Sequence, residues 1–210
     1  MSIAIIGIGN WGKNLIREFS KISIISHCIS QGNKANVNWL RQNYPHIIHT
    51  VNFESILKNP TITSIIIATP IPTHYDLALR SLNNGKNVFI EKTISETSSD
   101  ASQLLKIAKQ KKLHLFVGHV FNYHPIFQKI VKLNKTEKIV FMKFDWFKTE
   151  SSNENILLDL ASHDLFLISR LFGQPKSIKL ISSFKNFHSN DIVMIEVKFS
   201  HKICILDINR

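Results

Sequence analysis

One stretch decides how the chain folds: Ile3-Ala4-Ile5-Ile6-Gly7-Ile8-Gly9-Asn10-Trp11-Gly12. Its apolar start predicts a strand, and the pattern through Leu15, Ile16 and Phe19 predicts a helix directly after the glycines. In a strand–G-x-G-x-x-G–helix unit the first glycine allows a tight turn, the second lets the backbone approach a pyrophosphate, and the third permits close packing. The alternative for such glycines is a plain turn. The flanking strand and helix favour a phosphate site made of Gly7, Gly9, Asn10, Trp11 and Gly12.

Strand and helix patterns alternate through the first half of the chain. Strands are predicted at Ile22–Ile29, Ile47–Thr50, Ser64–Ala68, Asn87–Ile90 and His114–Val117, and helices near Asn36–Asn43, Phe53–Lys58, Thr73–Asn83 and Thr97–Lys111. This alternation predicts a doubly wound parallel sheet of the Rossmann type, in which ligands bind at the carboxyl ends of the strands. Ligand-binding candidates at such ends are Ser30, Ala68, Thr69, Pro70, Glu91 and Lys92.

After Gly118 the pattern changes. A helix pattern from Pro125 to Leu133 precedes a long alternating strand, Lys138–Thr149; a second helix, Ile156–Phe172, precedes two or three strands within Ile178–Asp207. Runs of strands after helices indicate an α+β domain with a mostly antiparallel open sheet. We therefore expect two domains, residues 1–120 and 121–210, with a hinge near His119–Pro125.

Composition restricts the functions open to this chain. With 210 residues, 44% of them hydrophobic and 20% charged, it can bury one good core and a smaller one. We expect a cytoplasmic protein, because no apolar run approaches the roughly 20 residues of a membrane span and the N-terminus shows no signal-peptide core. Cys28 and Cys204 match no metal spacing and are expected to be buried free thiols. No metal site is predicted.

The formal charge of +11 raises the possibility of nucleic-acid binding. The densest basic cluster, however, closes a predicted helix, where cations suit the negative end of the helix dipole; it contains Lys106, Lys109, Lys111 and Lys112. No zinc-finger spacing and no aromatic RNA-binding motif accompanies it. We expect neither a nucleic acid nor a membrane as partner, and an anionic small substrate suits the charge equally well.

Taken together, these residues resemble the glucose-fructose oxidoreductase, inositol dehydrogenase and MocA family (Gfo/Idh/MocA). The motifs that carry the resemblance are the glycine turn, Ala68-Thr69-Pro70 followed by Thr73-His74, Glu91-Lys92 in place of the family's Glu-Lys-Pro, and the pair Asp159 and His163. The resemblance implies an oxidoreductase that moves a hydride between NAD or NADP and a sugar hydroxyl. It also implies that His74 belongs to the cofactor site.

Two local strings resemble one branch of that family, the enzymes that oxidise nucleotide-linked sugars such as the UDP-N-acetylglucosaminuronate 3-dehydrogenases. They are the segments 118–125 and 159–165. The resemblance implies a nucleotide-sugar substrate and a substrate site that contains Lys92, Asn122, Tyr123, Asp159 and His163.

Lys92 is the predicted general acid/base, because oxidation of a secondary alcohol needs a positioned base for the hydroxyl proton. Its alternative is a surface ion pair with Glu91, which is awkward because adjacent strand residues face opposite ways. Asp159 and His163 are four residues apart and share a helix face. The resemblance implies that His163 hydrogen-bonds the reacting oxygen or shares the proton with Lys92, and that Asp159 orients the sugar or the imidazole. Asp164 is expected to be structural.

Two positions depart from the family pattern. No acidic residue stands near Ser30, where the second strand ends and where NAD enzymes usually bind the ribose hydroxyls. Ser30, Gln31 and Lys34 suit a 2′-phosphate instead, so NAD and NADP both stay open, with a slight lean to NAD by family habit. Thr93 replaces the family's proline and removes a fixed φ angle without removing the Lys92 amine.

The chain is also shorter than the family's usual members and stops at Arg210, soon after the apolar run Ile203–Leu206. The second sheet is therefore expected to be incomplete, with an apolar face or edge suited to homo-oligomer formation. A fragment, a decayed gene product and a short form completed by a partner are the alternatives. The rival to an enzyme is a catalytically silent nucleotide-binding remnant or partner subunit. We expect cofactor binding, weak or no turnover, and weaker hydrogen-exchange protection in Ile192–Leu206 than in Ile3–Ile6 and Ser64–Ala68. The sugar, the oxidised carbon and the oligomeric state stay open.

Overall fold

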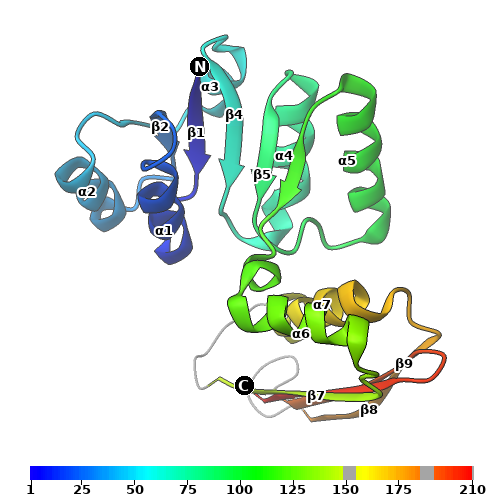
Figure 1. Cartoon of the computed structure of the whole chain (residues 1–210). Helices are drawn as coiled ribbons and strands as arrows, with labels where there is room; N and C mark the ends of the chain where they lie inside the picture. The colour runs from blue at the N-terminus through cyan, green and yellow to red at the C-terminus, as the bar shows by residue number, and fades with distance from the viewer. Residues whose placement is uncertain (149–154, 185–191, 210) are drawn as a thin grey trace. The chain divides into compact units, whose positions relative to one another are not determined.

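The structure, a computed structural model, describes residues 1–148, 155–184 and 192–209. The chain divides into two compact units, Met1–Gly118 and His119–Arg210, and each is described by itself (Figure 1). Within the described ranges, no helix combines the length and the apolar character that crossing a membrane requires.

The N-terminal unit is built on a parallel sheet. Its strands are β1 (Ser2–Ile6), β2 (Ile25–Ile29), β3 (Ile48–Thr50), β4 (Ile62–Ile67), β5 (Asn87–Ile90) and β6 (Leu115–Val117). Their order, β3-β2-β1-β4-β5-β6, is that of a doubly wound sheet, and every pairing is parallel. The predicted fold of this half is confirmed.

Helices cover both faces of this sheet. One face packs against α1 (Asn10–Phe19) and α2 (Lys34–Asn43), and the other against α3 (Phe53–Lys58), α4 (His74–Asn83) and α5 (Ser98–Lys111). A 3₁₀ turn, η1 (Ile71–Thr73), leads into α4. Burial on both faces explains why the central strands are continuous apolar runs rather than alternating ones; the three residues Ile65–Ile67 are at most 1% exposed.

The C-terminal unit has a mixed sheet with helices on one face (Figure 1). Its elements are η2 (Val120–Tyr123), α6 (Pro125–Thr136), β7 (Phe141–Phe147), a π-helical turn η3 (Leu157–Ala161), α7 (Ser162–Phe172), β8 (Ser177–Phe184), β9 (Ile192–Lys198) and β10 (Ile203–Asn209). The strand order is β7-β10-β9-β8, with β7 and β10 parallel and the other two pairings antiparallel. The predicted α+β architecture is confirmed.

Burial alternates along β9 and β10, as expected for a sheet that packs on one face only. The inward side chains contact the helix layer through Ile156, Leu160 and Ile168. Strand β8, at one end of the sheet, is exposed at every position.

The structure corrects several predicted element bounds. The second strand begins at Ile25 rather than Ile22, because the amides of Ile22 and Ser23 bond the Phe19 carbonyl and close a turn after α1. The predicted strand Lys138–Thr149 shortens to Phe141–Phe147, and Thr149 lies outside the described residues. The predicted helix from Ile156 opens with a π turn, a feature that apolar periodicity does not reveal.

Candidate functional site

The predicted motifs of the N-terminal unit lie along one edge of its sheet. Gly7, Ala68, Glu91 and Gly118 each follow a strand directly, and each donates its backbone N–H to the last carbonyl of a neighbouring strand, at 2.8, 2.8, 3.0 and 2.8 Å. The parallel ladder therefore ends in register at these four residues. Lys92 is the next residue beyond the β5 end of this row.

The three motif glycines have different local roles. Gly7 has φ +100°, and a Cβ there would lie 2.3 Å from the Ala68 carbonyl oxygen. A Cβ on Gly12 would lie 2.1 Å from the Gly7 carbonyl oxygen, so this glycine permits close packing of helix on strand. A Cβ on Gly9 would meet nothing within 4 Å. The first and third glycines thus serve the fold, whereas the second faces open space, as the phosphate-binding role requires.

A cavity of about 730 Å³ opens at this edge. Six predicted cofactor-binding residues line it: Gly7, Gly9, Ser30, Ala68, Thr69 and Pro70. The other predicted cofactor residues, Asn10, Trp11, Gly12, His74, Glu91 and Lys92, are not among its lining. A volume of this size fits a small-molecule cofactor.

The start of α1 supplies donors at the same place. Its N-cap is Gly9, which offers no side chain to the first-turn amides, whereas Asn33, Asn52 and Thr97 cap α2, α3 and α5 through side-chain oxygens. Uncapped amides at a helix start bind anions through N–H groups and the helix dipole. The open position at Gly9, the uncapped amides and the cavity together fit the pyrophosphate of a dinucleotide.

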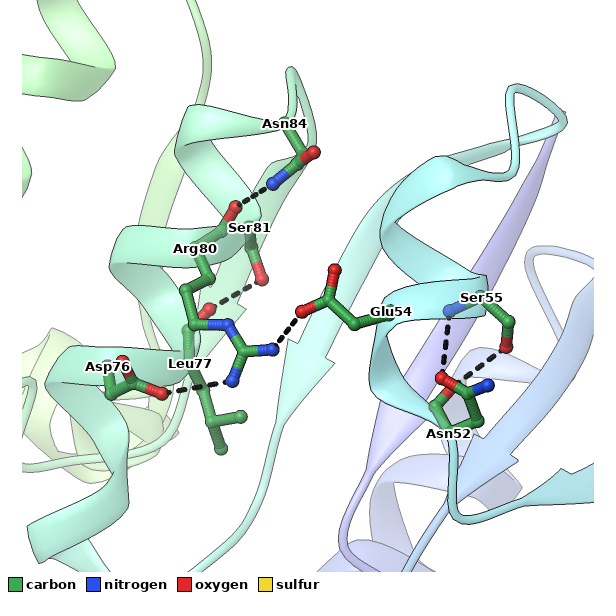
Figure 2. A network of polar contacts seen from close by, with 8 residues as sticks. All are labelled: Asn52, Glu54, Ser55, Asp76, Leu77, Arg80, Ser81 and Asn84. Carbon is green, nitrogen blue, oxygen red and sulfur yellow. Dashed lines mark hydrogen bonds and ion pairs between the residues drawn. The ribbon is translucent and has the colours of Figure 1, made fainter.

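Arg80 joins α3 to α4 through a polar network that includes Glu54 and Asp76 (Figure 2). Its guanidinium bonds Glu54 on α3 and, at 3.3 Å, Asp76 on α4, and it lies 4.7 Å from the centroid of the Phe53 ring. Phe53 and Asp76 line the cavity. Sequence reasoning missed this contact set, because its members are separated by a strand and are ordinary helix residues in the sequence.

Ser30 follows β2 and lines the cavity beside Gln31. Its Oγ lies 2.9 Å from Nε2 of His49 on β3, and the Gly32 amide donates to the same oxygen at 3.4 Å. The lining contains one carboxylate, Asp76, which is paired with Arg80. The end of β2 therefore presents the hydroxyl of Ser30 and the amide of Gln31 where many NAD sites present an acid.

The His74 side chain bridges two loop segments inside the N-terminal unit. It is fully buried, with Nδ1 2.7 Å from the Thr93 carbonyl oxygen and Nε2 2.8 Å from that of Thr69. These bonds join the segment after β4 to the segment after β5, next to Lys92. Direct contact of His74 with a cofactor stays a prediction; the observed contacts indicate that the ring acts through Thr69 and Thr93.

Glu91 is 8% exposed, and its buried Oε1 has no hydrogen-bond partner within the described part of the chain. Burial raises the pKa of its carboxyl, although the Trp11 and Lys92 donors oppose the shift. A Cβ on Gly118 would lie 2.6 Å from its Oε1, so the carboxyl occupies the space beside this glycine. Glu91 is thus a buried carboxyl directly before Lys92 at the end of β5.

In the C-terminal unit, Asp159 lies in the π turn and is 8% exposed, and its Oδ2 is 3.8 Å from Nζ of Lys148. π turns of this kind occur frequently at functional sites. His163 follows on α7. Both predicted residues therefore belong to one continuous helical segment, with a wider turn at Asp159 than the sequence predicted.

The His163 ring lies among aromatic side chains from two other elements. The centroid of Phe121 on η2 is 4.8 Å away at 76°, and that of Trp146 on β7 is 6.0 Å away at 24°. A second pair stacks at 3.8 Å: His119, the residue before η2, and Phe166 on α7. Sequence reasoning missed Trp146 as a site residue, although the period-two pattern of its strand places it on the helix-covered face.

The two remaining predicted substrate residues lie on η2. Tyr123 is 62% exposed. The side-chain oxygen of Asn122 is buried, and it has no hydrogen-bond partner within the described part of the chain. Their contact with a substrate stays a prediction.

Comparison with known proteins agrees with this fold. Residues 1–119 match the model of the Gfo/Idh/MocA oxidoreductase family, NAD-binding Rossmann fold. The chain is 26% identical to scyllo-inositol 2-dehydrogenase (NADP(+)) of Bacillus subtilis, over 66% of this chain and 43% of that protein. It is 22% identical to UDP-N-acetylglucosamine 3-dehydrogenase of Acidithiobacillus ferrooxidans, over 86% and 58%. A solved myo-inositol 2-dehydrogenase from Lactobacillus plantarum superposes with a TM-score of 0.89 at 20% identity, over 100% of this chain and 70% of that one, which shows the shared fold.

Because the family match covers more than half of its residues, the chain belongs to the Gfo/Idh/MocA oxidoreductase family, and its N-terminal unit carries that family's NAD-binding Rossmann fold. The chain spans about half the length of the curated relatives it matches, between 39% and 54% for the first three.

Proposed function

We propose that this chain carries the cofactor site and catalytic residues of an NAD(P)-dependent dehydrogenase that oxidises a hydroxyl-bearing carbon of a sugar or nucleotide sugar. One observation carries the proposal: Lys92 is the first residue past Glu91 on the sheet edge that also holds the open glycine turn and the cavity. A lysine amine at that edge is a candidate for proton transfer at a substrate bound beside the cofactor.

The proposed chemistry divides the two hydrogens of a secondary alcohol. When bound, the nicotinamide supplies the acceptor for the hydride that leaves carbon. Lys92 takes the hydroxyl proton, and it returns the proton in the reverse reaction. His163 hydrogen-bonds the reacting oxygen or shares that proton, and Asp159 orients the sugar or the imidazole. Asn122 and Tyr123 are proposed as further substrate contacts.

The substrate class rests on relatives and on charge. Two relatives are named for inositol and for a UDP-linked amino sugar, both of which carry rows of secondary hydroxyls. A formal charge of +11 suits an anionic substrate, and a nucleotide sugar carries phosphate. We therefore propose a nucleotide sugar first and an uncharged polyol second.

Single-turnover hydride transfer in a Lys92→Met variant tests the proposal. General acid–base groups contribute roughly 10²–10⁴-fold, so the rate should fall by at least about a hundredfold while the dinucleotide Kd stays unchanged. Lys109→Met, an exposed change of the same kind on α5, is the matched control and should leave both unaltered. Near-normal transfer in Lys92→Met would remove its assigned role. A wild-type chain that binds cofactor but transfers no hydride to UDP-N-acetylglucosamine or scyllo-inositol would favour a catalytically silent nucleotide-binding subunit.

A further inference from the structure

A buried carboxyl lies beside His163 in the sequence and faces a different neighbour. Asp164 is 2% exposed, and the Trp146 indole donates from Nε1 to its Oδ2 at 2.8 Å. This bond joins α7 to β7 across 18 positions of sequence. Adjacent residues on a helix do not face each other, so Asp164 acts on its surroundings through the indole rather than through its neighbour directly.

The same indole lies against His163. The ring planes are inclined by 24° with centroids 6.0 Å apart, and Phe121 contacts both rings, at 4.8 Å from His163 and 6.1 Å from Trp146. The imidazole therefore rests in an aromatic frame contributed by η2 and β7. The Trp146 indole cannot flip or tilt without breaking its hydrogen bond to Asp164. The Asp164 carboxyl therefore fixes the plane of the indole ring.

A carboxyl is an unusual choice for such an anchor. Burying a carboxyl that has a single hydrogen-bond donor costs more free energy than burying an apolar side chain of similar volume. Stability alone would therefore favour an apolar residue at this position. Burial accordingly raises the pKa of Asp164 to about 7, with the Trp146 bond opposing the shift. A buried carboxyl at this position is explained if the fixed orientation of the Trp146 indole serves the function of the site.

We infer that Asp164 is a positioning residue, which holds His163 in a productive orientation by anchoring the Trp146 indole against the imidazole. The inference rests on the proposed function, in which His163 contacts the reacting oxygen. The contact chain predicts that loss of the carboxyl oxygen and loss of the indole N–H have the same consequence, because each breaks the same bond.

Three variants separate positioning from general packing. Asp164→Leu removes the acceptor at similar volume, Trp146→Phe keeps a ring but removes the N–H, and Asp164→Asn keeps an oxygen acceptor. Asp207→Leu is the matched control, because Asp207 is a partly buried carboxylate on β10 of the same unit that pairs with Lys143. NMR of the full chain with labelled histidines reports the His163 imidazole, which is assigned by its loss in His163→Gln.

We expect Asp164→Leu and Trp146→Phe to shift the His163 ring resonances, and Asp164→Asn and Asp207→Leu to leave them in place. In single turnover with UDP-N-acetylglucosamine, the first two should lower the rate by at least about tenfold with little change in substrate affinity, since misplacement by about 1 Å can cost roughly 10²-fold. The double variant should lose no more than the larger single loss, because both changes break one bond.

Unchanged His163 resonances in a folded Asp164→Leu chain would overturn the inference, and so would additive losses in the double variant. If Asp164→Leu does not fold, Asp164→Val is measured by the same readout, because Trp146→Phe alters the ring current at His163 on its own. The NMR result is independent of turnover, so failure of the proposed activity and failure of the positioning role give different outcomes.

Discussion

The candidate site residues of the two units are positioned differently, by backbone groups in the N-terminal unit and by side chains in the C-terminal unit. In the N-terminal unit, the sheet edge that carries the predicted motifs is defined by backbone groups: four strand-end amides, the Gly9 opening and the first-turn amides of α1. In the C-terminal unit, His163 and Asp164 are positioned by side chains from η2 and β7. A backbone site depends on glycine spacing, whereas a side-chain site depends on partners brought together by folding.

A buried carboxyl next to a proposed catalytic residue occurs in both units. The two acids are Glu91, beside Lys92, and Asp164, beside His163. Trp11 lowers the pKa of the first, and Trp146 donates to the second at 2.8 Å. The two indoles differ in exposure, because Trp11 is 44% exposed and Trp146 is partly buried. The hydrogen bond of the C-terminal pair holds an aromatic ring inside a packed layer.

The largest expected contrast between the units is in hydrogen exchange. Strands β1 and β4 are central and covered on both faces, whereas β8 is a sheet-edge strand exposed at every position. Because local opening free energies range from near zero to the global value, amides of β1 and β4 should exchange at least about a thousandfold more slowly than those of β8. Strands β9 and β10 should fall between. Uniform protection throughout the described strands would contradict this contrast.

A pair of glycine variants tests the backbone origin of the N-terminal site. Gly12→Ala places a Cβ 2.1 Å from the Gly7 carbonyl oxygen and should lower the free energy of unfolding by about 3 kcal/mol. Gly9→Ala meets nothing within 4 Å and should change it by less than about 1 kcal/mol, yet raise the dinucleotide Kd at least about tenfold. Urea unfolding and titration calorimetry measure the two effects. Equal stability losses at both glycines would show that Gly9 serves packing rather than a ligand.

The pH dependence of stability should reveal the C-terminal carboxyl. Burial raises the pKa of Asp164 to about 7 from an ordinary value near 4, so the folded state holds a proton that the unfolded state releases between these values. Its contribution is fully present below about pH 4 and is lost as pH rises to about 7, at no more than about 1.4 kcal/mol per pH unit. Between about pH 5 and 7 the wild type should lose about 2 kcal/mol that Asp164→Asn does not lose. Urea unfolding at each pH, monitored by amide exchange in the C-terminal unit, measures this difference. If the free energy of unfolding had the same pH dependence in both proteins, the buried, protonated carboxyl would be contradicted.

The smallest expected effect concerns the choice of cofactor. A carboxylate at the end of β2 would accept hydrogen bonds from the ribose hydroxyls of NAD and repel a 2′-phosphate. Ser30→Asp should therefore shift the ratio of the NADP and NAD dissociation constants at least about tenfold toward NAD. A wild-type preference for NADPH that disappears in Lys34→Ala would show that the lean to NAD is wrong. No change of ratio in Ser30→Asp would place ribose recognition elsewhere in the cavity.

Much of the N-terminal unit could be predicted from the sequence, because local signals specify it. Gly7 and Gly12 mark places where a Cβ cannot fit, and apolar runs such as Ile65–Ile67 mark a sheet buried on both faces. The sequence did not predict that His74 bridges the segments after β4 and β5, or that Arg80 joins α3 to α4. Both depend on contacts between elements that no local pattern encodes.

The C-terminal unit was less predictable. Alternating apolar residues placed Trp146 on the covered face of its strand but gave no sign of its partners. The spacing of Asp159 and His163 predicted a shared helix, yet the π turn at Asp159 follows from packing rather than periodicity. The Trp146–Asp164 bond spans 18 positions and became visible only in the folded arrangement.

The central claim is that the backbone-built edge of the N-terminal unit binds a nicotinamide dinucleotide. Titration calorimetry of the full chain with NAD, NADH, NADP and NADPH, with hydrogen exchange on the complex, tests it most directly. Selective binding to the folded state must raise apparent stability. We predict measurable binding of at least one dinucleotide, with added protection at residues 7–12 and 68–70. Absence of binding by all four at about millimolar concentration, or added protection confined to the C-terminal unit, would contradict the account.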